Sequence, residues 1–73
     1  MIQPGIYKHY KGNLYQVLTI AKHSETLEDL VVYEALYENE MSQFWVRQVQ
    51  MFEEEVEVDG KRMKRFEFIK KDK

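Results

Sequence analysis

The stretch EEVEVDGKRMKR at residues 54–65 is typical of a tight two-stranded β-hairpin. A two-residue type I′ turn requires positive φ at both central positions, and Asp59-Gly60 suits both. With the turn there, counting outward places Val58 opposite Lys61 and ends with Glu54 opposite Arg65. Three of the five opposed pairs join opposite charges, and opposite-charge pairs stabilise an antiparallel ladder. The charged ladder therefore predicts the register of this hairpin.

The same hairpin accounts for the uneven distribution of charge. The net charge is −2, yet residues 1–60 carry 4 basic and 11 acidic side chains whereas residues 61–73 carry 7 basic and 2 acidic. A segment rich in Lys and Arg can bind nucleic acid or an anionic membrane, but most of these cations face the acidic strand of the hairpin. We therefore expect a solvated hairpin within one domain at residues 1–69, followed by a basic C-terminal tail at 70–73.

The composition of the 73-residue chain predicts one small domain with an aromatic core. Its ten aromatic residues are five Tyr, four Phe and one Trp. The absence of cysteine excludes disulfides, thiolate zinc sites and a thiol nucleophile. The N-terminus lacks a basic region followed by an apolar stretch, and no apolar run approaches the roughly 20 residues of a membrane span. We therefore expect a cytoplasmic protein with no membrane partner.

Four runs upstream of the hairpin have the composition of short β-strands, with β-branched and aromatic residues bounded by turn residues. A glycine-bearing turn, Lys11-Gly12-Asn13, joins the first two into another hairpin. The second run is apolar on both faces over much of its length, which fits a coiled sheet or small barrel better than a flat sheet. The four runs are residues 6–10, 14–21, 30–37 and 44–47.

Two further segments connect these strands. Residues 38–43 are polar and predict a loop in which Asn39 is able to adopt positive φ. Residues 48–52 predict a single 3₁₀ or α-helical turn that places Met51 or Phe52 in the core. Five or six short antiparallel strands together predict an all-β fold, a small barrel. The alternative is an α+β fold in which residues 48–57 form a longer helix.

A set of short motifs resembles a known family in combination, although each motif alone is weak. They are Tyr10-Lys11-Gly12, IAKHSET at 20–26, Val31-Val32-Tyr33 with Leu36-Tyr37, and Trp45-Val46-Arg47 with Met51-Phe52. Together they resemble a small bacterial family catalogued as domain of unknown function 1653, over residues 4–66. The family pattern commonly has a proline where this chain has Gln48. The resemblance implies an SH3-like barrel in a bacterial cytoplasm, and it implies no activity.

The segment His23-Ser24-Glu25-Thr26 is where imidazole, hydroxyl and carboxylate groups occur together in this sequence. A serine nucleophile needs a base and an oxyanion hole, yet neighbours on an extended strand point to opposite faces, which separates His23 from Ser24. Zinc needs three or four converging ligands, whereas His9, His23 and Glu25 lie on separate segments without a metal-binding motif. We therefore expect no catalytic residue, no metal, no cofactor and no enzyme activity.

Two interpretations of this segment remain open. In one, it is a loop that caps itself through bonds from backbone N–H groups to the Ser24 or Thr26 hydroxyl or the Glu25 carboxylate. In the other, it forms one wall of a recognition groove.

Strand parity supplies the opposite wall of such a groove. Tyr33 and Tyr37 share one face of their strand, and Trp45 and Arg47 share one face of the next. Either these aromatic side chains belong to the core, with Arg47 reaching solvent or pairing with Glu34 or Glu25, or they form a stacking platform beside a cation.

The patterns favour a noncatalytic binding module whose groove holds a peptide segment or a small anionic ligand. The alternative is a homodimeric assembly or structural protein paired through exposed strand edges, because ten aromatic residues are many for a small core to bury. Weak RNA binding ranks third, since tyrosines stack on bases but an acidic chain binds phosphates poorly. The candidate ligand-binding residues are His9, His23, Ser24, Glu25, Tyr33, Tyr37, Trp45 and Arg47.

Overall fold

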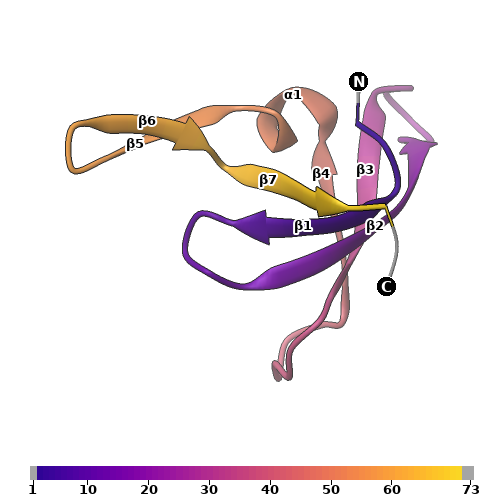
Figure 1. Cartoon of the computed structure of the whole chain (residues 1–73). Helices are drawn as coiled ribbons and strands as arrows, with labels where there is room; N and C mark the ends of the chain where they lie inside the picture. The colour runs from indigo at the N-terminus through magenta and orange to yellow at the C-terminus, as the bar shows by residue number, and fades with distance from the viewer. Residues whose placement is uncertain (1, 72–73) are drawn as a thin grey trace.

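The structure, a computed structural model, describes residues 2–71 and has seven strands and one short helix (Figure 1). The elements are β1 (Gly5–His9), β2 (Leu14–Lys22), β3 (Asp29–Ala35), β4 (Phe44–Gln48), α1 (Val49–Phe52), β5 (Glu55–Val58), β6 (Lys61–Lys64) and β7 (Phe66–Lys70). All strand pairs are antiparallel, which confirms the predicted all-β class. The α+β alternative is wrong, because α1 is a single turn. In the described part of the chain, no helix has the length and apolarity to span a membrane.

The β5-β6 hairpin has the predicted turn and register. Both turn residues have positive φ, 52° at Asp59 and 79° at Gly60, and the pairing runs from Val58 opposite Lys61 to Glu55 opposite Lys64. The turn chemistry therefore sets this register, as the Asp-Gly signal predicts.

The charge pairs in this hairpin follow the predicted ladder at its base and depart from it in the middle. At the base, the Arg65 N–H donates to the Glu54 carbonyl (3.0 Å), and the two side chains form an ion pair of 2.8 Å. Arg62 lies opposite Glu57 but bonds diagonally to Glu55 at 3.1 Å. Diagonal partners lie within reach of a long side chain such as arginine.

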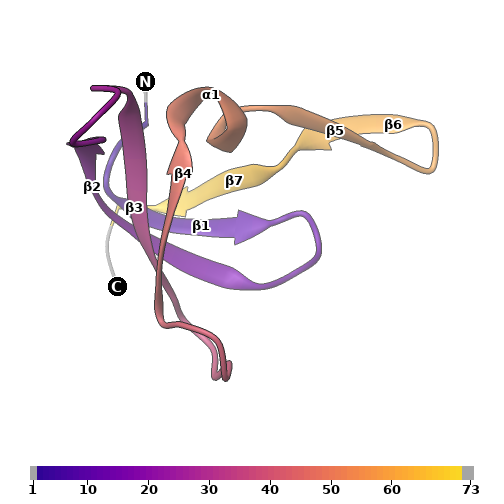
Figure 2. The same ribbon diagram turned by 180° about the vertical axis from the view of Figure 1, so that it is seen from behind.

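A five-stranded sheet with the order β4-β3-β2-β1-β7 forms the body of the domain. The register between β2 and β3 shifts between Val17 and Thr19, which leaves Leu18 as an extra residue. Such a bulge bends and twists a strand. Consequently β1 and β7 run across the view while β3 and β4 stand upright (Figures 1 and 2).

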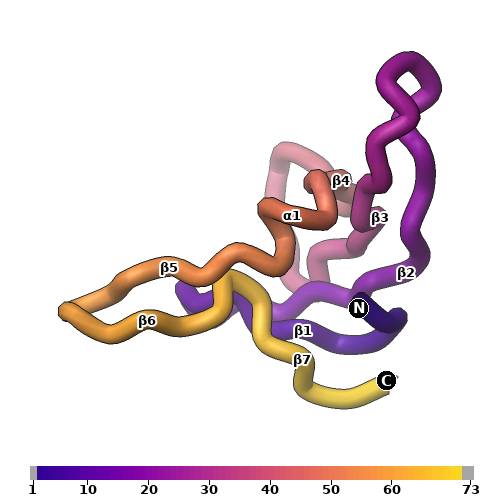
Figure 3. The backbone as a smooth tube through the Cα atoms, turned by 90° about the horizontal axis from the view of Figure 1, so that it is seen from above, coloured from indigo at the N-terminus to yellow at the C-terminus, as the bar shows by residue number. Residues whose placement is uncertain are grey.

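The hydrogen-bonded ladders within residues 2–71 do not close into a barrel. β4 and β7 are the two edges of the large sheet, and β5-β6 is a separate two-stranded sheet. The α1 turn follows β4 directly and redirects the chain into the β5-β6 hairpin, which projects away from the body (Figure 3). Because β7 runs to Lys70, the predicted basic tail begins inside a strand, and its residues 72 and 73 lie outside the described residues.

The core lies between the large sheet and α1. Phe52 of α1 stacks on Phe66 of β7 with ring centroids 4.1 Å apart, and the rings of Tyr7 and Tyr33 meet Phe52 edge-on. The helical turn thus delivers Phe52 to the core, whereas Met51 stays exposed. Fully burying such a side chain contributes about 1.5 to 3 kcal/mol, so this single turn anchors the open side of the sheet.

Candidate functional site

A pocket of about 250 Å³ opens on the inner face of the sheet, the face that carries the core, where β2, β3 and β4 meet the loop after β3. Trp45 lies opposite Tyr33 in the β3-β4 ladder, and Arg47 lies opposite Val31. Strand parity thus brings Tyr33, Trp45 and Arg47 to one face as the sequence predicts, and the loop adds Tyr37. The pocket is lined by Tyr15, Tyr33, Tyr37, Asn39, Met41, Trp45 and Arg47.

The aromatic residues differ in burial, so the core interpretation is correct for part of the set and the stacking platform stays a prediction. Tyr33 is 4% exposed and belongs to the core, where its ring also contacts Phe66. Tyr37 is 37% exposed, and Trp45 is half-buried. The pocket is therefore an opening of the core at the sheet surface, with a buried floor and a solvated rim.

Arg47 is the cation of this pocket. Its side chain is half-buried, its Cζ lies 5.9 Å from the centroid of the Phe66 ring, and its Nε–H donates to the Tyr33 hydroxyl at 3.5 Å. Of the two alternatives for Arg47, pairing with Glu34 or Glu25 does not occur among residues 2–71, and Glu34 accepts from the amide of Gln43. The ion pairs of the described residues all lie elsewhere, so no carboxylate neutralises Arg47.

A pair of tyrosine hydroxyls lies at the mouth of the pocket. Tyr15 and Tyr37 have their oxygens 2.8 Å apart and their rings edge-on at 5.5 Å. Burial, followed by the hydrogen bond to Tyr37, raises the pKa of Tyr15 well above its usual range. Tyr15 therefore keeps its hydroxyl proton at neutral pH. Because one hydroxyl proton satisfies the mutual bond, the second is able to donate to a ligand.

Two more polar groups complete the wall. The indole Nε1 of Trp45 is buried and has no hydrogen-bond partner among residues 2–71. The side-chain oxygen of Asn39 accepts from the N–H groups of Met41 (3.0 Å) and Ser42 (2.9 Å). This turn holds the loop without positive φ at Asn39, in contrast to the sequence expectation, and the Asn39 amide NH₂ remains a donor. Every polar side chain of the lining can thus donate a hydrogen bond, and none is acidic.

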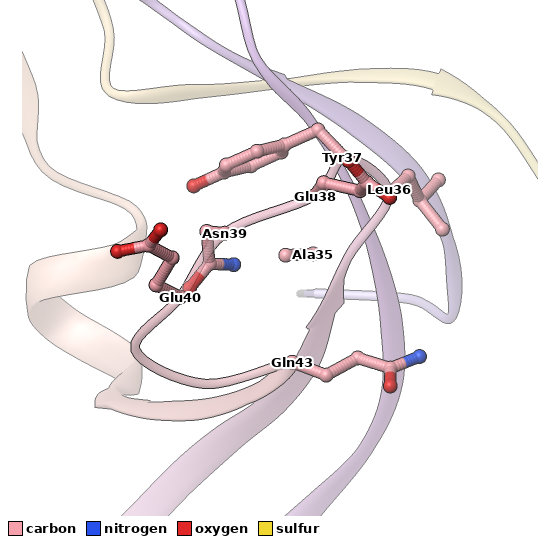
Figure 4. A pocket seen from close by; sticks show the side chains of 7 residues that line it. All are labelled: Ala35, Leu36, Tyr37, Glu38, Asn39, Glu40 and Gln43. Atoms are coloured by element: carbon pink, nitrogen blue, oxygen red, sulfur yellow. The ribbon is translucent and has the colours of Figure 1, made fainter.

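A second hollow of about 790 Å³ lies inside the adjoining loop (Figure 4). Tyr37 and Asn39 belong to both linings and separate the two spaces. Figure 4 shows Tyr37 and Glu40 pointing to one side of the loop and Gln43 to the other. With Glu38 and Glu40 in its lining, this hollow suits a neutral or cationic group.

The segment from His23 to Thr26 does not contribute to the pocket. It lies at the opposite end of β3 from the 36–43 loop (Figure 1), and His23, Ser24 and Glu25 are not in the lining. The imidazole Nδ1 of His23 accepts from the N–H groups of Glu25 (3.1 Å) and Thr26 (3.2 Å). The self-capping interpretation is therefore correct for this loop. The Thr26 hydroxyl accepts from the Glu28 N–H at 3.2 Å, as expected, and the His23 imidazole is a further acceptor that the sequence did not predict.

His9 lies beside the pocket without entering it. Its Nδ1 accepts from the Lys11 N–H at 3.1 Å, and its ring packs against Tyr10 (4.5 Å) and Phe66 (4.9 Å). Burial, followed by the positive charges of Arg65, Arg47 and Lys11, lowers the pKa of His9 from 6.5, so the imidazole is neutral at pH 7. Within residues 2–71 no three acidic or histidine side chains are grouped in a way that could hold a metal ion.

Three lining residues were not predicted from sequence. Tyr15 shares strand parity with the buried Val17, and this alternation was a usable signal for its inward direction. For Asn39 the sequence indicates only a turn residue. Met41 is 84% exposed at the loop tip, and the sequence around it does not indicate that it lines the pocket.

Comparison with known proteins places the chain in a structural context. A family described as "Protein of unknown function (DUF1653)" matches residues 5–68. A crystal structure of a DUF1653 protein from Bordetella bronchiseptica is 34% identical in sequence and superposes with a TM-score of 0.90, covering 93% of this chain and 87% of that one. Among curated proteins there is no match.

Proposed function

The chain belongs to the DUF1653 family, and from this premise we propose that it is a noncatalytic binding module that holds a carboxylate beside Arg47. The carboxylate belongs to a peptide segment or to a small anionic ligand with an apolar body. We further propose that the fold is an opened form of the SH3-like barrel. This is supported by the curl of the large sheet and by the α1 turn at its open side. A bacterial cytoplasmic location agrees with the cysteine-free sequence.

The observation that carries this proposal is the unneutralised guanidinium of Arg47. A half-buried cation is costly unless an anion or hydrogen-bond acceptors accompany it. Here the Phe66 ring and the Tyr33 hydroxyl position the guanidinium, but neither provides negative charge. Arginine binds carboxylates through two parallel hydrogen bonds, which are among the stronger polar contacts in proteins.

The rest of the lining supports an organic carboxylate over a bare inorganic ion. Tyr33, Trp45 and Met41 provide apolar walls, and aromatic side chains with polar tips suit ligands that are part apolar and part polar. The second proton of the Tyr15-Tyr37 pair lies at the rim of the same pocket and provides another donor to the carboxylate.

The pocket chemistry also supports a noncatalytic role. The raised pKa of Tyr15 makes its phenol a poor base at neutral pH. None of the seven lining residues is a Ser, Cys, Lys, His, Asp or Glu, so the lining lacks the usual nucleophile and base pair.

Trp45 is the single tryptophan of the chain and lines the pocket, so its fluorescence reports occupancy directly. The probes are N-acetylphenylalanine and its uncharged amide, which differ in the carboxylate. We expect the acid, and not the amide, to change Trp45 emission saturably. Losing a hydrogen bond to a charged group weakens binding by about 1.5 to 3 kcal/mol, so Arg47→Gln should raise the Kd roughly 10- to 100-fold.

The matched control is Arg62→Gln, which removes the same charge from the exposed β5-β6 hairpin. This variant should bind like the wild type, and circular dichroism should show that both variants fold. Equal binding of the acid and the amide, or unchanged affinity in folded Arg47→Gln, would refute the proposal.

A further inference from the structure

β4 is an edge strand with one side of its backbone unpaired in the sheet. The Ala35 N–H donates to the Gln43 carbonyl at 2.7 Å, so Ala35 and Gln43 are a hydrogen-bonded pair of the β3-β4 ladder. Hydrogen-bonded and non-hydrogen-bonded pairs alternate along such a ladder. By this alternation Trp45 and Arg47 direct their N–H and C=O groups to β3, while Phe44 and Val46 direct theirs away. Phe44 agrees with this assignment, since its N–H and C=O both bond to the Ser42 hydroxyl.

The outward side chains of this edge are apolar. Phe44 is 55% exposed and Val46 is 59% exposed, and both lie on the outer face of the sheet beside β3. Natural edge strands are commonly protected by lysine, proline or a bulge, and β4 has none of these among its five residues. The outward N–H and C=O groups of Val46 are unpaired in the sheet, beside apolar side chains, and such groups are a template for another β-strand. Those of Phe44 bond to the Ser42 hydroxyl, which a partner strand must displace.

We propose that this strand is a second copy of β4, paired antiparallel about a two-fold axis at Val46. A two-fold interface requires each residue to meet its counterpart in reverse order. In this register Val46 meets the partner's Val46, and Phe44 meets the partner's Gln48. Trp45 then meets the partner's Arg47 at a position without mutual hydrogen bonds, where side chains approach most closely. Arginine over an indole ring is a favourable cation–π pair, and the symmetry forms it twice.

The opposite edge lacks this self-complementarity when the axis likewise lies at the central residue of its strand. β7 has the sequence FEFIK, and a two-fold axis at Phe68 would place Glu67 against the partner's Ile69. That register pairs a carboxylate with an aliphatic side chain twice, so it is less favourable than the central register of β4. Pairing at β4 also brings the two Arg47 pockets side by side, since Trp45 and Arg47 line each pocket. The dimer does not depend on the carboxylate proposal.

Charge variants at Val46 test the axis while leaving Trp45 and Arg47 intact. Wild-type protein should show a concentration-dependent monomer–dimer equilibrium in sedimentation velocity. Val46→Lys and Val46→Glu each place like charges opposite one another at the axis and should raise the dimer Kd at least about tenfold. An equimolar mixture of the two variants should dimerise again, because the axis then pairs opposite charges. Ile69→Lys, a similar change at the exposed face of β7, should dimerise like the wild type.

A wild-type monomer at about 1 mM protein would overturn the proposal. So would undiminished dimerisation of Val46→Lys, or a mixture of folded variants that stays monomeric, because either result places the contact away from Val46. If the monomer instead binds an acetylated peptide of residues 44–48 without self-association, the edge accepts peptide strands and the proposed dimer is wrong.

Discussion

Gly5→Ala should weaken the junction of β1 and β7 and, with it, the packing of Phe66 against Arg47. Gly5 has φ of 148°, and a Cβ there would lie 2.5 Å from the Lys70 carbonyl oxygen, 2.9 Å from the Lys71 carbonyl oxygen and 2.9 Å from the Phe68 ring. Two of these atoms belong to the backbone, so no rotamer change relieves the overlap. β7 must move, and it carries Phe66, which supports Arg47.

The expected magnitude has two parts. An alanine at this φ is strained by about 1 to 3 kcal/mol, and overpacking against β7 adds about 1 to 3 kcal/mol. A domain of this length has a total stability of roughly 4 to 11 kcal/mol. Gly60→Ala is the matched control, because Gly60 also has positive φ (79°) but its added Cβ meets nothing within 4 Å. The control should therefore show the strain alone.

Urea denaturation followed by Trp45 fluorescence measures both variants. With an m-value of about 1 kcal/mol/M, the midpoint of Gly5→Ala should lie about 1 to 3 M below that of Gly60→Ala. Equal midpoints would mean that β7 moves away from Gly5 without a loss in the free energy of unfolding, and β7 would then not be held tightly at this junction.

Two further predictions concern titration. His9 has a lowered pKa in the folded protein, so the unfolded chain binds a proton first as the pH falls below 6.5. Stability is therefore lost from there down through the folded pKa. His9→Gln should flatten this part of a Tm profile measured between about pH 7.5 and 5, and an unchanged profile would contradict the lowered pKa of His9. Tyr37→Phe removes the hydroxyl bonded to Tyr15, so the pKa of Tyr15 should fall but stay above its usual value because burial is the larger cause. NMR titration of the Tyr15 ring measures this change, and a pKa equal to that of the wild type would exclude a role for the bond.

Local chemistry made much of the fold predictable. The Asp59-Gly60 turn determined the β5-β6 register because a two-residue turn leaves no freedom in the count. Alternation along β3 and β4 brought Trp45 and Arg47 to one face for the same local reason. Whether the sheet closes into a barrel was not predictable in this way, and it stays open. The outcome depends on how the Leu18 bulge and the α1 turn direct distant strands. Both features act through tertiary geometry, which short-range patterns do not encode.

The candidate site illustrates the same division. His23-Ser24-Glu25-Thr26 concentrates polar chemistry in the sequence, yet its imidazole is used within its own turn. The pocket instead combines Tyr15, Asn39 and Arg47 from three segments, and no short motif joins them. What distinguishes Arg47 is the lack of a carboxylate partner, a property set by where Glu34 and Glu25 lie in space. The sequence contains more acidic than basic residues, so it does not indicate that any cation lacks a counterion. Composition gives the number of charged residues but not their positions in space.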